Sequence, residues 1–204
     1  MDANGNILED AYKKDSYYLF LKAFETIKAS ETPVKNIVVD LSINGGGHVA
    51  ALYRCLGFIT RSFLVSERDS LSKIAYTQKF YVDTNNDGKY DEKDSYTGYN
   101  WYILTSFNSY SSANMFTYAA KDNSSNVKII GGQAGGGACS ILPFIGIDGT
   151  SLQISGTNQN VFLTRNGTSY SYEVLENGPQ VDYELSYDKY YDRAYLNTYL
   201  NTLR

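Results

Sequence analysis

Three short and nearly continuous apolar runs, each followed closely by a turn of small or polar residues, constrain the fold of this chain more than any other feature. The runs span residues 36–41, 101–105 and 127–130, and the turns span residues 44–47, 106–112 and 131–137. Apolar runs of this length are typical of strands that are buried on both faces. The pattern predicts a mixed α/β fold in which each of these strands leads into a turn of small residues.

Helical spacing of apolar residues predicts helices around these strands. The first follows Ser16, which can cap it, and the second follows the turn at 44–47. A third begins near Ala113, and a fourth closes the chain. Their apolar positions are Tyr17, Phe20, Leu21, Phe24 and Ile27, then Val49, Leu52 and Leu56, then Ala113, Phe116 and Ala120, and finally Tyr195, Leu196, Tyr199, Leu200 and Leu203.

The remaining segments carry strand and turn signals. Residues 63–82 have a strand-like pattern with a polar interruption at 67–70, and a turn-rich stretch follows at 83–98. Beyond Ser140, hairpins are predicted by turn signals at Asp148-Gly149, Asn158-Gln159 and Asn166-Gly167. No repeat or low-complexity linker divides the chain. We therefore expect residues 1–204 to form a single domain with additional β-hairpins.

The composition excludes several classes of function. The 204 residues carry 18 Lys and Arg against 22 Asp and Glu, and no basic block occurs, so the sequence gives no basis for binding nucleic acid or an anionic membrane. The two cysteines, Cys55 and Cys139, lack the C-x-x-C spacing of zinc and thioredoxin-like sites. A single histidine, His48, makes a multi-histidine metal centre impossible.

The start of the chain lacks the basic and apolar regions of a signal peptide, and no apolar run approaches the roughly 18 residues that span a bilayer. We therefore predict no transmembrane segment in this chain. Because Met1 can head a piece cut from a longer precursor, the missing signal does not by itself place the chain in the cytoplasm.

The turn Asn44-Gly45-Gly46-Gly47 is the first candidate for chemistry. Three glycines allow the backbone to approach a ligand closely, and N–H groups at the start of a helix can stabilise a developing oxyanion. The alternative is a tight strand-to-helix turn without a function. The glycines alone leave both interpretations open.

The segment Asn108-Ser109-Tyr110-Ser111-Ser112 is the second candidate, because a strand leads there to serines at the start of a helix. The N-terminus of a helix is electropositive, which favours a nucleophilic oxygen. An ordinary serine N-cap would leave the same pattern. Taken alone, this segment is better explained by an ordinary serine N-cap than by a nucleophile.

Several motifs in register resemble those of a known peptidase family. Residues 38–47, V-V-D-L-S-I-N-G-G-G, resemble the D-L-R-x-N-x-G-G signature of the S41 peptidases, the C-terminal processing or tail-specific proteases. Residues 109–116, S-Y-S-S-A-N-M-F, are similar to that family's nucleophile segment, T-A-S-A-x-E-x-F. Residues 128–137 resemble its V-x-G-E-x-T-x-G stretch, and residues 176–182 its late G-x-x-P-D segment. Order and spacing agree over residues 34–185.

This resemblance implies an α/β core of the crotonase and ClpP type that hydrolyses peptide bonds with a serine nucleophile. Carried over by position, Ser111 is the nucleophile. One N–H of the oxyanion hole then comes from Ser112 and the other from Gly46 or Gly47. Ser109 or Ser112 would be the nucleophile if the alignment were shifted. The family also implies a polypeptide substrate, a secreted or cell-surface location and a longer precursor.

The chain departs from the family at the general base. Many S41 enzymes place a Lys in the turn after the strand that follows the nucleophile helix, but this turn reads Gly135-Gly136-Gly137-Ala138-Cys139. Ser42 and Asn114 also replace an Arg and a Glu that are usual in the flanking motifs. A serine hydroxyl without a base is a poor nucleophile at neutral pH. We predict that His48, directly after the first glycine turn, is the base. The alternative is a structural His48 with a base supplied by another part of a longer precursor.

A twelve-residue stretch from Asp83 to Asp94 has the pattern of an EF-hand-type calcium loop. Oxygen-bearing side chains stand at alternating positions around a central glycine, Gly88. The ligands would be Asp83, Asn85, Asp87, Lys89 through its carbonyl, Asp91 and Asp94. We predict a structural Ca²⁺ at the tip of a hairpin insertion at about 78–99. A turn rich in Asn, Asp and Gly would use the same residues without a metal.

These observations predict a serine endopeptidase of the S41 type, with no organic cofactor. The first alternative is a peptidase-like module that binds a peptide or another ligand after losing its base. The second is a crotonase-type acyl-CoA enzyme, because that fold shares the oxyanion architecture. The serine turn and the late Gly178-Pro179-Gln180-Val181-Asp182 segment disfavour this second alternative.

Overall fold

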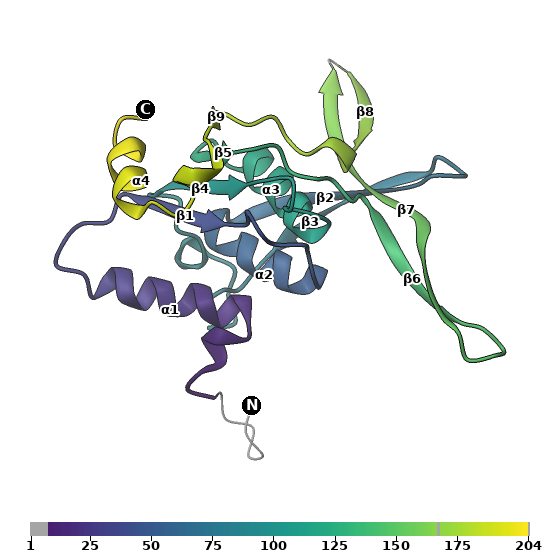
Figure 1. The fold of residues 1–204 in the computed structure, drawn as a ribbon, viewed down its shortest axis with the longest axis horizontal. Helices are drawn as coiled ribbons and strands as arrows, with labels where there is room; N and C mark the ends of the chain where they lie inside the picture. Colours follow the sequence, from purple (N-terminus) through teal and green to yellow (C-terminus); the bar gives the residue numbers. More distant parts are fainter. Residues whose placement is uncertain (1–7, 167, 204) are drawn as a thin grey trace.

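Four strands form a parallel sheet in the order β1-β4-β5-β9 (Figure 1). They are β1 (Asn36–Asp40), β4 (Asn100–Thr105), β5 (Val127–Gly131) and β9 (Tyr183–Glu184). The computed structural model describes residues 8–166 and 168–203. The three predicted apolar runs are therefore three adjacent strands, and the predicted α/β fold class is confirmed.

Helices cover both faces of this sheet, as the continuous apolar pattern of its strands requires. The helices are α1 (Ser16–Lys28), α2 (Val49–Ile59), α3 (Ser112–Asn123) and α4 (Arg193–Leu200). Trp101, Ile103 and Ile129 point to the face that packs with α1, α2 and α3. Tyr102, Leu104 and Ile130 point to the opposite face, where α4 lies. The central strands are thereby held between two hydrophobic layers.

The cap of α1 differs from the sequence prediction by one residue. Asp15, not Ser16, is the N-cap, and its carboxylate accepts the N–H groups of Tyr17 (2.8 Å) and Tyr18 (3.3 Å). A carboxylate at the N-terminus of a helix gains from the helix dipole in addition to the hydrogen bonds. Asp15 is therefore the stronger cap of the two neighbours.

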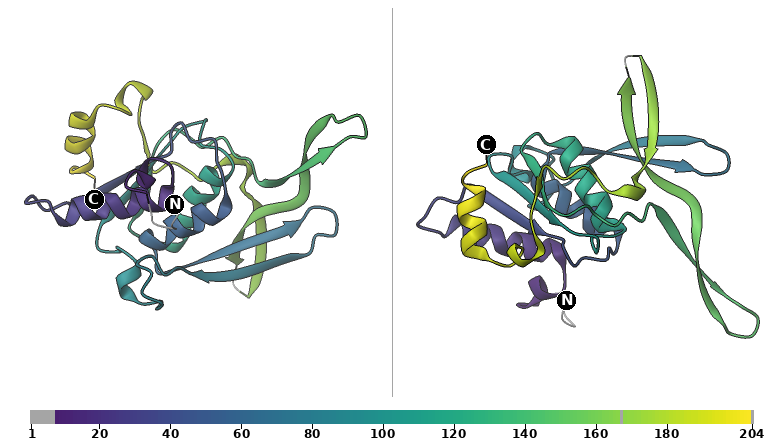
Figure 2. Two further views of the ribbon diagram at one scale, coloured as in Figure 1. Left: turned by 90° about the horizontal axis from the view of Figure 1, so that it is seen from below. Right: turned by 45° about the horizontal axis from the view of Figure 1, so that its top comes forward.

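A second, antiparallel sheet is built from hairpins that extend beyond the helices, on the side away from α4 (Figures 1 and 2). Its strands are β2 (Ser62–Asp69), β3 (Ala75–Tyr81), β6 (Cys139–Ile145), β7 (Ser151–Asn166) and β8 (Ser169–Val174). Their order is β3-β2-β7-β6, and β8 also pairs with β7. The hairpins predicted at Asp148-Gly149 and between β7 and β8 are confirmed. Gly167 itself lies outside the described residues.

The turn predicted at Asn158-Gln159 is wrong, because both residues lie within the continuous strand β7. This strand changes partners along its length: β6 pairs with its first part, β2 with its middle and β8 with its end. The asparagine and glutamine that suggested a turn mark the point where partners change. Polar residues inside a strand can therefore be mistaken for a turn when only the sequence is known.

The hairpin insertion predicted at about 78–99 also differs from the structure. Strand β3 ends at Tyr81 in the antiparallel sheet, and β4 begins at Asn100 in the parallel sheet. The residues between them form a loop that crosses from one sheet to the other and contains the short helix η2 (Glu92–Asp94). The predicted calcium residues therefore lie on an inter-sheet connection instead of a hairpin tip.

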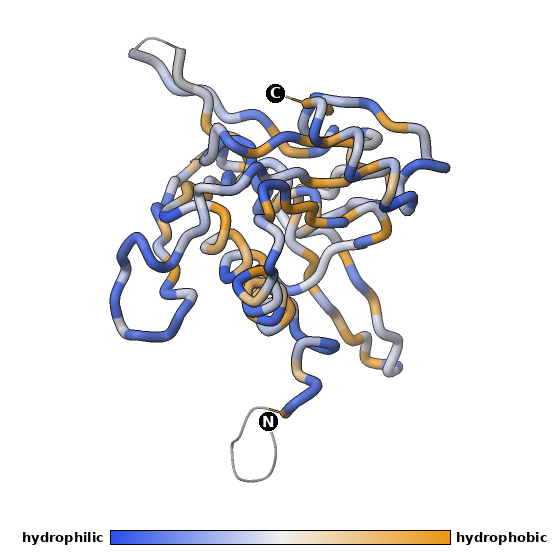
Figure 3. The backbone as a smooth tube through the Cα atoms, turned by 90° about the vertical axis from the view of Figure 1, so that its left-hand side faces the viewer, coloured by the Kyte–Doolittle hydropathy of each residue, from blue (hydrophilic) through white to orange (hydrophobic). Residues whose placement is uncertain are grey.

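Hydrophobic residues run along the strands at the centre of the molecule, and hydrophilic residues dominate the loops around them (Figure 3). None of the helices in the described ranges is long and apolar enough to cross a lipid bilayer. The termini of the parallel strands, and the turns that follow them, are the part of the fold that brings the predicted site residues together.

Candidate active site

The first two predicted turns meet at the carboxyl edge of the parallel sheet. The backbone N–H of Tyr110 donates to the carbonyl of Asn44 (3.0 Å). The hydroxyl of Ser112 donates to the carbonyl of Gly47 (2.7 Å). Parallel strands bring their carboxyl ends to one edge, which is where ligands bind in open α/β sheets. The glycine turn and the serine turn are thus joined in the region where a site is expected.

The third predicted turn reaches the same point. The N–H of Ser111 donates to the carbonyl of Gly136 (2.8 Å), and the N–H of Gly135 donates to the carbonyl of Ser109 (2.9 Å). Tyr110 and Gly136 form an isolated parallel bridge. All three turns that follow the apolar strands therefore surround Ser111.

Ser111 has a strained backbone. Its φ of 55° and ψ of −121° lie outside the regions that L residues ordinarily occupy. Such a conformation costs about 1–3 kcal/mol and persists where the surroundings hold it in place. Ser111 is the N-cap of α3, yet its side chain makes no capping hydrogen bond. The sharp turn from strand to helix has the form of a nucleophile elbow, and an ordinary serine cap does not explain it.

Ser111 is also the serine of this turn whose hydroxyl has no hydrogen-bond partner among the described residues. Ser109 is fully buried, and its hydroxyl donates to the carbonyl of Leu41 (2.7 Å). The same hydroxyl accepts the N–H of Ser106 (3.0 Å). Ser112 is engaged with the glycine turn. The hydroxyls of the two alternative serines are bonded to the backbone of neighbouring turns, whereas the hydroxyl of the half-buried Ser111 is not.

Gly46 lies so close to Ser111 that no side chain fits between them. A Cβ at position 46 would lie 2.7 Å from Cβ of Ser111 and 2.8 Å from the carbonyl oxygen of Tyr110. The φ of Gly46 is 104°, which also favours glycine. A Cβ at Gly45 would meet nothing within 4 Å. Close contact therefore requires glycine at position 46 specifically.

Two backbone N–H groups beside Ser111 have no acceptor in the part of the chain that the structure describes. They belong to Gly47 and to Ser112, the first residue of α3. The N–H of Gly46 is already bonded to the side chain of Asn44 (2.9 Å). Of the two glycines that the sequence left open, Gly47 is therefore the one with a free donor. The N–H of Ser112 also carries the partial positive charge of the helix N-terminus.

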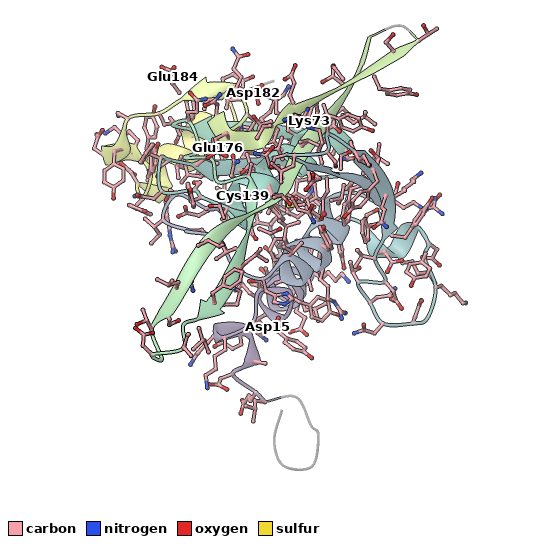
Figure 4. The ribbon with its side chains drawn as sticks, turned by 90° about the vertical axis from the view of Figure 1, so that its right-hand side faces the viewer. Asp15, Lys73, Cys139, Glu176, Asp182 and Glu184 are labelled. Atoms are coloured by element: carbon pink, nitrogen blue, oxygen red, sulfur yellow. The ribbon has the colours of Figure 1, made fainter. Side chains whose placement is uncertain are left out.

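Two side-chain contacts near the third turn were not predicted from the sequence motifs in which their residues lie. The carboxylate of Glu176, in the short helix η3 (Leu175–Asn177), accepts the N–H of Ala138 (3.0 Å), and Glu176 lies near the start of β6 at Cys139 (Figure 4). The buried side chain of Asn114 donates to the carbonyl of Leu175 (2.5 Å). Both contacts join residues that are distant in sequence, so spacing gave no signal for them.

The third turn has no room for the Lys that many S41 enzymes carry there. A Cβ at Gly135 would lie 2.1 Å from the carbonyl oxygen of Phe107, and one at Gly136 would lie 1.8 Å from that of Glu176. A Cβ at Gly137 would lie 2.7 Å from the ring of Tyr110. These three glycines are thus required by close packing of the backbone, and none of them can be replaced by Lys without a clash.

His48 is exposed and serves as the N-cap of α2. Its Nδ1 accepts the N–H of Ala50 (3.2 Å). A neutral imidazole that accepts at Nδ1 carries its proton on Nε2, so in this arrangement Nε2 is a donor. No hydrogen bond joins His48 to Ser111 within the described residues. The structure places His48 at the edge of the glycine turn, and its role as a base stays a prediction.

The predicted calcium ligands bind the backbone of their own loop. The carboxylate of Asp83 accepts the N–H of Gly88 (2.8 Å). Asp94 is buried, and its two oxygens accept the N–H groups of Thr84 (2.8 Å) and Asp91 (2.9 Å). Within residues 8–166 and 168–203, no three His, Cys, Asp or Glu side chains gather to hold a metal ion. The oxygen ligands suit Ca²⁺, but the ion would have to replace these bonds, so the site stays a prediction.

The model of peptidase family S41 matches residues 9–177, well over half of the chain. A search of curated proteins finds no match. Among solved structures, a lipoprotein from Streptococcus agalactiae is 20% identical with a TM-score of 0.56, and the match covers 90% of this chain and 61% of that one.

Two further structures share the fold. The photosystem II D1 C-terminal processing protease is 16% identical with a TM-score of 0.59, over 88% of this chain and 40% of that one. Mature CPAF is 15% identical with a TM-score of 0.60, over 98% of this chain and 46% of that one. The chain thus spans between 40% and 61% of the length of these three structures. At such identities the similarity shows the fold alone.

We expect Gly46→Ala to damage the site, because the added Cβ would overlap Cβ of Ser111. The free energy of unfolding should fall by about 1–3 kcal/mol in a urea titration, as overpacking and an unfavourable φ imply. Gly45→Ala is the matched control, and it should change stability by less than about 0.5 kcal/mol. Equal stability of the two variants would contradict the contact.

The calcium prediction is tested by titration calorimetry. We expect one Ca²⁺ site in the unmodified chain and none in Asp87→Ala, because position 5 of the loop supplies a carboxylate ligand. Asp148→Ala, in a different exposed turn, is the control and should bind as the unmodified chain does. Absence of heat in the unmodified chain, or heat that Asp87→Ala leaves unchanged, would show that the loop is a turn without metal.

Proposed function

Because this chain belongs to peptidase family S41, we propose that it is a serine endopeptidase that cleaves polypeptides by attack of Ser111. The observation that carries the proposal is the strained backbone of Ser111, which lies where the serine turn meets the glycine turn. Among the described residues, its hydroxyl and the N–H groups of Gly47 and Ser112 have no hydrogen-bond partner. Strained residues cluster at active sites, where strain contributes to pre-organisation. The other non-glycine residues with positive φ, Lys73 and Asn86, lie in exposed loops.

In the proposed reaction, Oγ of Ser111 attacks the carbonyl carbon of the scissile peptide bond. The carbonyl oxygen gains negative charge and accepts hydrogen bonds from the N–H groups of Gly47 and Ser112. The C–N bond then breaks, the amine leaves with the proton that Ser111 gave up, and the acyl group stays on Oγ. A water molecule releases the acyl group by the same sequence of steps.

The proton of Ser111 needs an acceptor, and we assign this role to His48. It directly follows Gly47, the residue that supplies one of the two free N–H groups. To act as a base, His48 has to release the N–H of Ala50 and accept a proton at a free nitrogen. Giving up an N-cap bond costs about 1 kcal/mol, which is small beside the contribution of a general base.

A peptide-binding module without catalysis is the second candidate. It is favoured by the three consecutive glycines at 135–137, none of which leaves room for a Lys side chain, and by the hydrogen bond that Nδ1 of His48 already accepts. In that case the free N–H groups of Gly47 and Ser112 would bind a carbonyl or carboxylate oxygen of the ligand without reaction. A secreted or cell-surface location and a longer precursor are further parts of the proposal that rest on family membership.

Labelling with a fluorophosphonate tests the nucleophile. We expect the unmodified chain to be labelled at Ser111, and Ser111→Ala to lose all labelling. Ser112→Ala is the matched control, because it keeps the backbone N–H that we assign to the oxyanion hole. Labelling that survives in Ser111→Ala and is lost in Ser109→Ala or Ser112→Ala would overturn the assignment. A folded chain that takes no label would favour the binding module.

Two substitutions separate the proposed base from the helix cap. His48→Asn keeps a good N-cap but removes the imidazole, so we expect unchanged stability and a labelling rate lower by about two to four orders of magnitude. His48→Ala should lose the same activity and about 1 kcal/mol of stability, measured in urea. A fully reactive His48→Asn would show that the base lies elsewhere.

A further inference from the structure

The hairpin formed by β6 and β7 projects away from the helices and the parallel sheet (Figures 1 and 2). In its outer half, residues 141–145 pair with residues 151–155, and all of these residues are exposed. Among the described residues no further strand joins this half, because β2 pairs with β7 only at 158–161. A two-stranded hairpin without other support is only marginally stable in water. The outer half is therefore a segment that gains from an external partner.

One face of this outer half is entirely apolar. Residues opposite each other in a β-ladder, and residues two apart along a strand, point to the same side. Leu142 pairs with Ile154 and Phe144 pairs with Leu152, so these four side chains form one continuous patch, the hairpin face. Each of the four exposes between 44% and 54% of its surface. On the opposite side, the apolar residues of β6 pair with serine and glutamine residues of β7.

The size of the hairpin face suits a protein interface. A fully covered aromatic side chain buries about 150–250 Å², so four half-exposed large side chains offer on the order of 400 Å². A standard interface takes about 800 Å² from each partner, of which roughly 60% is apolar. The hairpin face thus supplies most of the apolar area that one partner of a dimer needs.

The hairpin carries almost no charge. Asp148 is the only charged residue from Cys139 to Thr164, and its carboxylate accepts the N–H (3.0 Å) and the hydroxyl (2.8 Å) of Thr150. In a two-fold symmetric dimer, each patch meets a copy of itself. A charged patch would repel its own copy, whereas the hairpin face has no charge that could do so. It is therefore complementary to itself.

A lipid surface fits the hairpin less well than a second copy does. β6 is the last strand of its sheet, so its outer edge has unpaired N–H and C=O groups in the described part of the chain. Open sheet edges do not occur in the hydrocarbon of a bilayer, because such groups find no partner there. Contact between two hairpin faces leaves the edges at the rim, where water reaches them. Pro143, in the middle of β6, also makes this edge a poor template for a further strand.

We propose that two copies of this chain associate through the hairpin face of each, in a two-fold symmetric dimer. The two hairpins pack face to face, at the spacing of about 10 Å that is usual for stacked sheets. Because the contact is apolar and small, we expect a dimer that dissociates in the micromolar range. This inference is independent of the role assigned to Ser111.

Sedimentation velocity at chain concentrations of about 1 to 200 μM tests the dimer. We expect the unmodified chain to change from monomer to dimer within this range. The change should occur at low and at high salt alike, because no charges meet in the interface.

Two neighbouring residues give a matched pair of variants. Phe144→Lys places a charge in the hairpin face and should weaken the dimer at least tenfold, because a charge without a partner is costly to bury. Ile145→Lys puts the same charge on a residue that points to the opposite side and is 80% exposed, so it should dimerise as the unmodified chain does. Leu142→Lys should weaken the dimer as Phe144→Lys does. All three positions are exposed, and circular dichroism verifies that the variants fold.

Each other result overturns the proposal. A chain that stays monomeric at all concentrations, or a dimer that Phe144→Lys leaves unchanged, would exclude the hairpin face as an interface between copies. Equal weakening by Phe144→Lys and Ile145→Lys would show that the interface is not this face. A monomer that sediments with phosphatidylcholine vesicles, and stops doing so in Phe144→Lys, would assign the face to lipid. Labelling of Ser111 by the fluorophosphonate is measured separately, so either proposal can fail without the other.

Discussion

The contact between Gly46 and Ser111 is the constraint on which the rest of the site depends. Because the two backbones approach to a distance that excludes a Cβ at position 46, both turns adopt positive φ. Hydrogen bonds from Tyr110 to Asn44 and from Ser112 to Gly47 hold the turns together and offset part of this strain. At this junction the N–H groups of Gly47 and Ser112 and the hydroxyl of Ser111 have no hydrogen-bond partner within residues 8–166 and 168–203.

The two sheets contribute differently to the arrangement of the three turns around Ser111. The parallel sheet is fixed between two hydrophobic layers, so the carboxyl ends of β1, β4 and β5 are rigid supports for the three turns. Strand β6 of the antiparallel sheet begins directly after the third turn, where Glu176 accepts the N–H of Ala138. Strand β2 of that sheet contributes Phe63 and Val65 to the buried core on the face with α1, α2 and α3. Precise positioning comes from strands and helices, and the functional groups lie on the loops between them.

Local signals in the sequence were enough to predict the parallel strands, the helices and the turns that converge on Ser111. Continuous apolar runs of this length are typical of strands covered on both faces, and the three glycines at 45–47 allow a close approach of the backbone. The sequence did not predict which strands pair with β7, because this strand pairs with three other strands along its length. The cap at Asp15 was missed because a neighbouring serine is also a good cap. Glu176 and Asn114 lie within segments that resemble family motifs, but their contacts with Ala138 and Leu175 depend on the tertiary fold and were not predicted.

The assembly of the site from distant segments has a consequence for how the chain folds. The bond that joins the serine turn to the glycine turn spans 65 residues, and the bond from Asn114 to the carbonyl of Leu175 in η3 spans 61. Contacts of such separation form slowly, because loop closure has to precede them. The positive φ of Ser111 has no such support until these contacts exist. A partly folded chain in which the parallel strands have not yet paired therefore lacks the backbone conformation of the site.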